Sequence, residues 1–184
     1  MRKLIVYIAC SIDGYIAKPN DNLDFLKIVE KEGEDYGYAS FFESVDTILI
    51  GRRTFDWVVQ QVGLAHYQAL DKRVIVISSQ AKAQEKNIEY YSGSIPQLIE
   101  ELKSKEGKNL FCDGGALLIH ELLQHHLIDE IYLSIVPILL GDGISLFKSG
   151  REEQRYQVKN VQSFDTGLVQ IHYTKVEQSS LSPE

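Results

Sequence analysis

Short, nearly continuous runs of apolar residues recur along the chain, and each of them predicts a buried β-strand. The runs are rich in Ile, Val and Leu and are bounded by turn-forming residues. Strands that are apolar on both faces belong to covered, mostly parallel sheets. The runs occupy residues 3–10, 46–50, 73–77, 87–91, 109–112 and 128–136. We therefore expect a mostly parallel central sheet.

Between these runs, apolar residues recur at helical spacing. The helical segments cover residues 22–31, 36–44, 94–105 and 116–125, and a further helix opens after Gly51. Asp21 or Asn22 is placed to cap the first helix, and Ser94 precedes a later one in the same way. This alternation of buried strands and amphipathic helices predicts a three-layer α/β fold with helices on both faces of the sheet.

The last third of the chain follows a different pattern. Residues 137–143 contain a proline and two glycines and predict a loop. Residues 156–164 and 168–176 alternate polar and apolar positions around Asp165-Thr166-Gly167. This alternation predicts an antiparallel hairpin at the edge of the sheet.

The length of 184 residues suits one domain with a sizeable core. No repeat or linker divides the chain, so we expect residues 1–176 to form a single domain followed by a polar tail at 177–184. Lys and Arg number 19 against 26 Asp and Glu, and the net charge of -7 argues against nucleic acids and anionic membrane surfaces as partners. A small anionic ligand held by local donors is compatible with this charge.

Signals for export or membrane insertion are not found in the sequence. No apolar stretch approaches the roughly 20 residues that span a bilayer. The apolar run near the N-terminus is interrupted by Asp13 and Gly14, unlike the core of a signal peptide. Cys10 and Cys112 lie in apolar strand-like runs and are expected to be buried free thiols. These features indicate a cytoplasmic protein.

Polar residues and glycines follow four of the predicted strands. The junctions are Ser11–Gly14, Gly51–Thr54, Ser78–Gln80 and Asp113–Gly115. In an open α/β sheet, ligands bind at the carboxyl ends of parallel strands, where helix N-termini present free backbone N–H groups. We therefore expect the four junctions to line a common cleft.

The second junction carries the donors best suited to a phosphate. Gly51 allows a close turn from strand into helix, and the next three residues supply two guanidinium groups and a hydroxyl. Those residues are Arg52, Arg53 and Thr54. The alternative interpretation is a solvated helix start with a surface pair of arginines.

The third and fourth junctions offer weaker signals of the same kind. Ser78, Ser79 and Gln80 could hold a phosphate or cap a helix. Gly114 and Gly115 permit close backbone approach to a pyrophosphate, or form a plain tight turn.

Isolated carboxylates are the candidates for proton transfer. Asp113 is preferred because it is predicted at the cleft, where burial would raise its pKa toward that of a useful proton donor. Asp24, on the first predicted helix, is the second candidate. Both residues, like Asp13, also have structural interpretations as first-turn or turn-forming carboxylates.

Motifs of several common enzyme classes are missing. The chain has no G-x-x-x-x-G-K-[ST], no G-x-G-x-x-G after the first strand and no G-x-S-x-G, which argues against P-loop nucleotidases, the usual Rossmann site and nucleophile-elbow hydrolases. His120 and His125 form H-E-x-x-x-H, and they lie roughly 140° apart around a helix, too far to share a metal ion. We expect no metal site.

Taken in order, these motifs resemble the dihydrofolate reductase fold family, and more closely its branch that contains the reductase domain of the bifunctional riboflavin-biosynthesis deaminase/reductase. The resemblance covers the chain from Leu4 to about Val176. It is carried by Ser11–Ala17, Gly51–Phe55, Ser78–Gln80, Asp113–Ala116, Leu127–Glu130 and Val136–Gly143. It implies a dihydrofolate reductase-like fold and a homodimer, and the apolar segment Ile135–Leu140 also suggests a covered surface.

The resemblance implies NADPH as the cofactor. The backbone of Ala9 and Ile16 would hold the nicotinamide carboxamide. The remaining implied contacts are Gly51, Arg52, Arg53 and Thr54 for the phosphates, Ser78, Ser79 and Gln80 for the 2′-phosphate side of the adenosine, and Gly114, Gly115 and Ala116 for the pyrophosphate. Ala116 stands where dihydrofolate reductases can carry an Arg, so a preference for NADP would rest on Arg52 and Ser79.

The implied reaction is hydride transfer from NADPH to a carbonyl or imine carbon of a small heterocycle or ribosylaminopyrimidine, as in 5-amino-6-(5-phosphoribosylamino)uracil reductases, with an acid that supplies the proton. The segment Asn22–Leu26 lacks the Pro of the W-x-L-P-x-[DE] pattern, which puts Asp24 out of register for dihydrofolate reduction. The zinc signature of the fused deaminase is also missing. The alternatives are a non-catalytic dinucleotide-binding protein and a dihydrofolate reductase.

Overall fold

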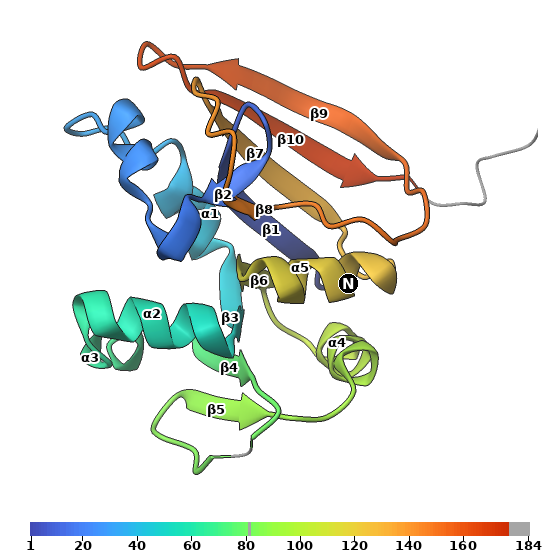
Figure 1. The fold of residues 1–184 in the computed structure, drawn as a ribbon. Coiled ribbons are helices and arrows are strands. Elements are labelled where there is room, and N and C mark those ends of the chain that lie inside the picture. The colour runs from blue at the N-terminus through green and yellow to red at the C-terminus, as the bar shows by residue number, and fades with distance from the viewer. Residues whose placement is uncertain (81, 177–184) are drawn as a thin grey trace, which may run out of the picture.

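An eight-stranded sheet, with the strand order β5-β4-β3-β6-β1-β7-β10-β9, runs through the molecule (Figure 1). The structure is a computed structural model that describes residues 1–80 and 82–176. The strands are β1 (Leu4–Ser11), β3 (Val45–Gly51), β4 (Arg73–Ile77), β5 (Ile88–Tyr91), β6 (Asn109–Gly114), β7 (Glu130–Val136), β9 (Tyr156–Ser163) and β10 (Val169–Lys175). Each of the six predicted apolar runs forms one of these strands.

The strands are parallel over most of the sheet and antiparallel at its C-terminal edge. β1 pairs in parallel with β6 and β7, and β3 does so with β4 and β6. β10 pairs antiparallel with both β7 and β9. The predicted mostly parallel sheet with a C-terminal hairpin is confirmed. A separate two-stranded ribbon joins β2 (Tyr15–Ala17) to β8 (Ile144–Ser145).

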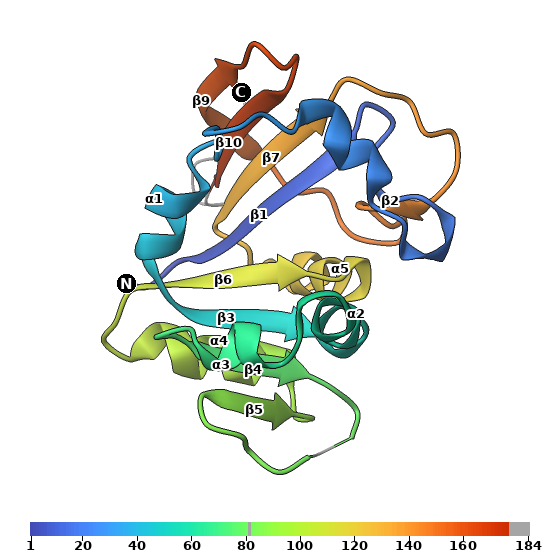
Figure 2. The same ribbon diagram turned by 90° about the vertical axis from the view of Figure 1, so that its left-hand side faces the viewer.

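Helices cover both faces of the sheet, as predicted (Figures 1 and 2). They are α1 (Tyr38–Glu43), α2 (Arg52–Val62), α3 (Ala65–Gln68), α4 (Ile95–Ser104) and α5 (Ala116–Gln124). Under α4 and α5, Leu102 and Leu122 share a buried cluster with Leu110 of β6. On the other face, Phe55 of α2 shares a second cluster with Phe111. Each such side chain contributes roughly 1.5–3 kcal/mol through burial, which holds the three layers together.

The prediction of an α-helix over residues 22–31 is wrong. A short 3-10 helix, η2 (Asp24–Val29), replaces it, and another, η1 (Pro19–Asp21), lies just before it. The side chain of Asn22 accepts a hydrogen bond from the backbone N–H of Asp24 at 2.8 Å and closes a local turn. Within η2 only Phe25 and Val29 are buried, so packing on the sheet does not stabilise a longer α-helix here.

Smaller predictions have mixed outcomes. Ser94 occupies the N-cap position of α4, but its side chain makes no capping hydrogen bond. Cys10 and Cys112 are free and buried, as predicted, and burial raises the pKa of their thiols to about 11 and about 12. The predicted tail at 177–184 lies outside the described residues. In the part of the chain that the structure describes, no helix is long and apolar enough to cross a membrane.

The carboxyl ends of the parallel strands point to one edge of the sheet (Figure 2). α2 begins directly after β3, and α5 begins close behind β6. The register pairs Gly51 with Ile77 of β4, and Ile50 with Gly114 of β6. Three of the four predicted junctions therefore lie side by side at this edge, and the fourth ends the neighbouring β1.

Candidate functional site

The ends of β3 and β6 approach each other closely at two glycine positions. Gly115 has a φ of +91°, and a Cβ atom there would lie 2.9 Å from Oγ1 of Thr54. A Cβ on Gly51 would lie 3.5 Å from the carbonyl oxygen of Gly114. Both the backbone conformation and the lack of space therefore require glycine at position 115. The structure brings these two junctions together.

Two helix N-termini open at this contact. Neither α2, which follows Gly51, nor α5, which follows Gly115, has a side chain that caps its first turn. The first N–H groups of a helix have no partner within the helix, and together with the helix dipole they favour an anion. Ala116, the first residue of α5, is buried. The edge of the sheet thus presents two converging sets of backbone donors.

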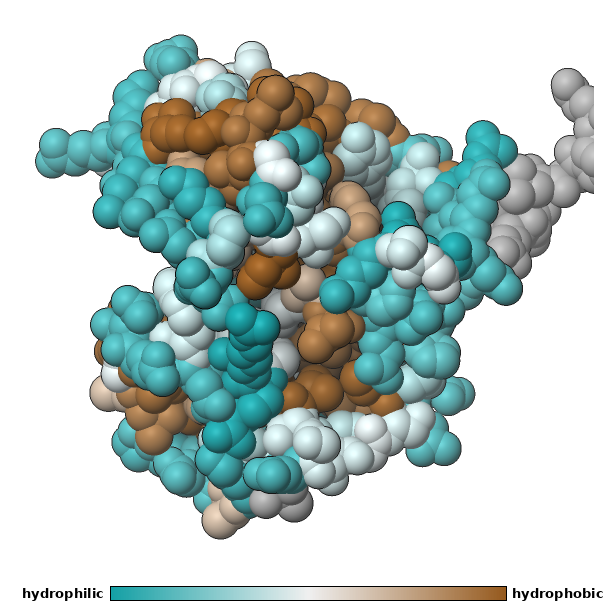
Figure 3. Space-filling view, viewed as in Figure 1, coloured by the Kyte–Doolittle hydropathy of each residue, from teal (hydrophilic) through white to brown (hydrophobic). Residues whose placement is uncertain are grey.

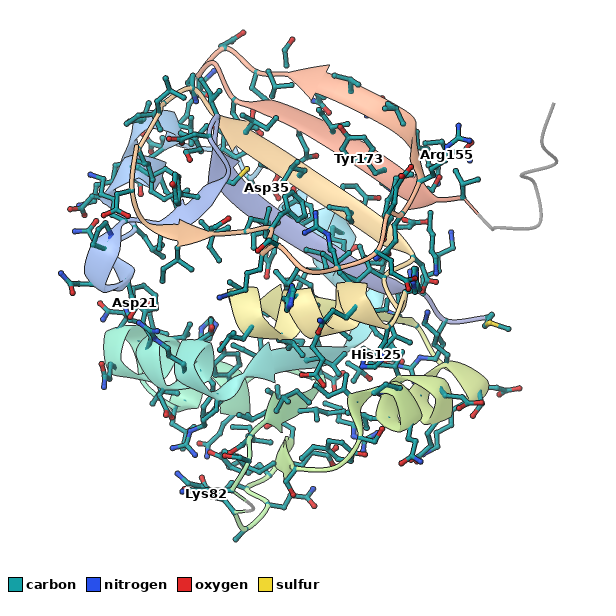
Figure 4. All side chains as sticks on the ribbon, turned by 45° about the vertical axis from the view of Figure 1, so that its right-hand side comes forward. Asp21, Asp35, Lys82, His125, Arg155 and Tyr173 are labelled. Carbon is teal, nitrogen blue, oxygen red and sulfur yellow. The ribbon has the colours of Figure 1, made fainter. Side chains whose placement is uncertain are left out.

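Both arginines of the second junction form ion pairs. Nε of Arg52 donates to the carboxylate of Asp56 at 2.7 Å. Arg53 pairs with Asp21 at 2.7 Å, and Figure 4 shows Asp21 beside α2. The side chain of Arg53 is 75% exposed, against 29% for Arg52. Arg52 is therefore the better ordered of the two guanidinium groups at this helix start.

Cations and an aromatic ring surround the predicted adenosine side. The backbone N–H of Gln80 donates to Oγ of Ser78 at 3.1 Å, which makes a local turn, and Ser79 is exposed beside it. Cζ of Arg52 lies 5.6 Å from the centre of the Tyr90 ring, and Nζ of Lys82 lies 5.4 Å from it. Hydroxyls, two cations and a π-face suit an adenosine that carries a phosphate.

The first junction is tied to the loop after β7. Asp13 accepts hydrogen bonds from the backbone N–H groups of Leu140 at 3.1 Å and Gly141 at 2.7 Å, and from the Ser11 hydroxyl at 2.5 Å. The bond from Ser11 and then those from the backbone lower the pKa of Asp13 to about 2. Asp13 is thus a structural carboxylate, one of the two interpretations that the sequence allows.

Asp113 is a carboxyl that the fold partly buries beside this edge. It lies one residue before Gly114 and on the same face of β6 as Phe111, where the Tyr67 hydroxyl donates to its Oδ2 at 3.3 Å. Burial raises the pKa of Asp113 to about 7, and the hydrogen bond from Tyr67 opposes part of this rise. Burial, and then the charge of Asp113, raises the pKa of Tyr38 and of Tyr67. A carboxyl with a pKa near 7 can donate a proton at neutral pH.

Asp24 has a different environment. Its side chain is 56% exposed, accepts a hydrogen bond from Asn22 at 3.0 Å and pairs with Lys27 at 3.1 Å. The bond from Asn22, followed by the interaction with Lys27, lowers the pKa of Asp24. Asp24 is therefore ionised at neutral pH, which suits a proton donor less well than the environment of Asp113.

A cavity of about 590 Å³ opens between η2, β1 and β7. Its wall includes Tyr7, Ala9, Leu26, Val29, Ser134 and Leu168. The volume suits a small heterocyclic ligand. Val6 pairs with Cys112, so the next residues along these parallel strands, Tyr7 and Asp113, lie on neighbouring strands and the same face. Of the two predicted nicotinamide contacts, Ala9 lines the cavity. The other, Ile16, lies on β2 and packs against the cluster under α5.

A hydrogen-bond network joins polar residues of this cavity wall to Gln170 of β10, and the sequence did not predict it. Nε2 of Gln170 donates to the Tyr7 hydroxyl at 2.8 Å and to Oγ of Ser134 at 3.1 Å. The Tyr7 hydroxyl donates to the carbonyl oxygen of Tyr36 at 2.7 Å. The one available signal is a polar residue inside the C-terminal strand. Tyr67 carries no such signal, because it lies on the four-residue α3.

Solved structures share this fold. A protein of Shewanella sp. PV-4, provisionally described as a riboflavin biosynthesis protein, matches with a TM-score of 0.86 and 30% identity over 95% of this chain and 99% of its own. A deaminase/5-amino-6-(5-phosphoribosylamino)uracil reductase of Thermotoga maritima gives 0.71 and 16%, over 95% and 57%. Dihydrofolate reductase of Enterococcus faecalis, complexed with NADP(H), gives 0.63 and 15%, over 95% and 97%. The fold is therefore dihydrofolate reductase-like, as predicted.

The chain belongs to the RibD C-terminal domain family, whose model matches residues 2–170. The uncharacterized protein YwjB of Bacillus subtilis (strain 168) is 33% identical over 175 residues, which cover 95% of this chain and 98% of YwjB. The resemblance that the strand-end motifs indicate is confirmed at the level of the family.

Asp113 makes the stability of the protein depend on pH. Folding raises its pKa from 3.8 to about 7, so the folded state holds this proton more tightly and loses stability as the pH rises through that range. Asp113→Asn removes the loss. The free energy of unfolding, measured by urea denaturation, should therefore fall in the wild type relative to D113N as the pH rises. We expect the difference between the two proteins to change by up to roughly 3 kcal/mol in favour of D113N from pH 5 to pH 8. The exposed Glu100→Gln should run parallel to the wild type, and a parallel course for D113N would contradict the shift.

Proposed function

We propose that this protein is an NADPH-dependent reductase of a small heterocycle or ribosylaminopyrimidine, of the type that acts in riboflavin biosynthesis. The observation that carries the proposal is Asp113, a partly buried carboxyl with a pKa of about 7. It lies one residue before the glycine junction and next to Tyr7, a residue of the cavity wall on the neighbouring strand. Membership of the RibD C-terminal domain family supports reductase chemistry. The likeness to a dihydrofolate reductase complexed with NADP(H) supports the cofactor.

The strand-end residues fit a dinucleotide. The close approach at Gly115 keeps side chains out of the space between the two helix starts, and their first turns are uncapped. Backbone donors there would hold the pyrophosphate. The residues that would hold NADPH are Ala9, Ile16, Gly51, Arg52, Arg53, Thr54, Ser78, Ser79, Gln80, Gly114, Gly115 and Ala116, with Lys82 added from the contacts around Tyr90.

The residues around the cavity have separate roles in the reaction. Bound NADPH would supply a hydride to the substrate carbon. Asp113 would give its proton to the substrate atom on which negative charge develops. Tyr67 would position the carboxyl through its hydrogen bond, and the apolar Leu26 and Val29 would limit the access of water from η2.

Two other functions compete with this proposal. A non-catalytic protein would bind the dinucleotide and turn nothing over, so oxidation of NADPH with a panel of pteridines, ribosylaminopyrimidines and quinones would reject it. A dihydrofolate reductase would use its first-helix carboxylate, and here Asp24 is 56% exposed, with a pKa that the bond from Asn22 and the pairing with Lys27 lower. Sensitivity to methotrexate would favour that alternative.

NADPH should stabilise the protein against heat. At 100 times Kd, a ligand that binds only the folded state adds about 2.7 kcal/mol, which corresponds to a rise in Tm of roughly 5–10 °C for a chain of this size. Because Arg52 would contact the 2′-phosphate of the adenosine, Arg52→Ala should weaken the binding of NADPH about tenfold and that of NADH, which lacks this phosphate, less.

Arg155→Ala is the matched control, because Arg155 is exposed and lies near the end of β10, away from α2 (Figure 4). It should leave both affinities unchanged. No thermal shift with saturating NADPH would reject the cofactor. Equal losses of affinity for NADPH and NADH in R52A would reject the contact with the 2′-phosphate.

Asp113→Asn should abolish the proton transfer while the fold persists. We expect kcat to fall about 10²–10⁴-fold, and wild-type kcat to fall as the pH rises above about 7, where the carboxyl loses its proton. The measurement is NADPH oxidation with the best substrate of the panel. Asp24→Asn tests the second carboxylate in the same assay, and a large loss there with none in D113N would transfer the role to Asp24.

We also propose a homodimer. Beyond α5, the face of β7, β10 and β9 carries rows of apolar residues that are partly or fully exposed: Ile135 with Val169, Leu133 with Ile171 and Val161, and Tyr173 with Val158. Figure 3 shows the hydrophobic surface over these strands, and Figure 4 labels Tyr173 on β10. Val158 is 56% and Val161 57% exposed. A contiguous apolar face of this kind marks an interaction surface.

Light scattering should give about twice the chain mass of 20.9 kDa. Val161→Glu should reduce it to the monomer mass, because the carboxylate would be buried in the interface. Val62→Glu, at an equally exposed position of α2, should leave the dimer intact. A monomeric wild type at micromolar concentration would reject the dimer.

A further inference from the structure

We propose that the cavity between η2, β1 and β7 takes a neutral or cationic heterocycle and excludes substrates that carry a phosphate. This inference rests on the proposed reductase function and narrows its substrate class. The substrate would then differ from that of the Thermotoga maritima enzyme, whose name includes a phosphorylated compound.

The inner wall of the cavity suits an uncharged planar ring. The Tyr7 ring stacks between Phe41, with ring centres 4.7 Å apart, and Tyr132, at 5.3 Å, so its position is fixed. The hydroxyl groups of Tyr7 and Ser134 lie at the same wall, and Gln170 donates to both of them. These groups recognise the carbonyl and ring nitrogen atoms of a heterocycle and supply no positive charge.

The mouth of the cavity carries negative charge. Four of the lining residues are carboxylates, Glu30, Glu32, Glu34 and Asp35. The single lining cation, Lys31, pairs with Asp165 at 3.3 Å. A phosphate at this mouth would face a net charge of three negative units, the four carboxylates less one lysine.

The acidic segment is held in place by its own hydrogen bonds. Asp35 accepts from the N–H groups of Gly37 at 2.8 Å and Ala39 at 3.0 Å, which lower its pKa and keep it ionised. Glu34 accepts from the N–H of Tyr36 at 2.9 Å. The Tyr36 hydroxyl donates to Oγ1 of Thr166 at 3.0 Å, which ties the segment to the C-terminal hairpin. The negative charge therefore stays at the mouth.

The two remaining carboxylates take no part in these hydrogen bonds. Glu30 and Glu32 are exposed, and neither side chain has a hydrogen-bond or ion-pair partner among the described residues. The cations of the proposed cofactor site, Arg52 and Lys82, lie instead around Tyr90 of β5. The groups that attract a phosphate and those that repel it therefore lie in different places, the cations around Tyr90 and the carboxylates at the mouth of the cavity. The protein can thus bind a phosphorylated cofactor and still exclude a phosphorylated substrate.

The test compares one heterocycle with and without its phosphate. Binding of 5-amino-6-ribosylaminouracil and of its 5′-phosphate to the NADP⁺-loaded protein is measured by calorimetry at low salt, and NADPH oxidation by both is measured alongside. We expect the unphosphorylated compound to bind at least about tenfold more tightly. Because repulsion between exposed charges is screened over about 10 Å at 0.1 M salt, the ratio should shrink as salt is added.

Glu30→Gln combined with Glu32→Gln should make the phosphorylated compound bind about tenfold more tightly and leave the binding of the unphosphorylated one unchanged. The matched control, Glu100→Gln with Glu106→Gln, removes the same charge from α4 and the turn that follows it, on the other face of the sheet, and should change neither. Equal or tighter binding of the phosphate, no response to the Gln pair, or no binding of either compound would overturn the inference. Failure of NADPH itself to bind would overturn the proposed function, which separates the two failures.

Discussion

The close contact between the β3–α2 and β6–α5 junctions is the constraint on which the candidate site depends. With φ of +91° and only 2.9 Å between a Cβ at Gly115 and Oγ1 of Thr54, the contact admits a single residue type at that position. It sets two helix starts next to each other and leaves their first N–H groups facing the same space. A larger residue would separate the helices and disperse the donors.

The same strand end that makes this contact also carries the acid. Asp113 precedes the two glycines on β6, so the geometry that fixes the helix start fixes the carboxyl as well. Burial beside Tyr67 and the aromatic cluster around Phe111 raises its pKa, and the hydrogen bond from the Tyr67 hydroxyl opposes part of that rise. The proposed proton donor, the backbone donors and the cavity wall are thus connected through adjacent strands of one sheet.

Much of the fold could be predicted from local pattern. Apolar runs bounded by turn residues locate the strands, and the rule that ligands bind at the carboxyl ends of parallel strands selects Gly51–Thr54 and Asp113–Gly115. The first helix could not be predicted correctly, because the Asn22 turn and the limited burial of η2 outweigh its helical spacing. Gln170 lies 163 residues from Tyr7, and only the completed sheet brings them together.

A crystal structure with NADP⁺ would show whether a dinucleotide lies across the glycine contact with its reactive ring at the cavity. We expect pyrophosphate oxygens within hydrogen-bond distance of the first N–H groups of α2 and α5, with the nicotinamide beside Ala9 and toward Asp113. NADP⁺ bound elsewhere, for example in the groove under residues 149–154 on the α5 face, or a nicotinamide directed away from Asp113, would contradict this expectation.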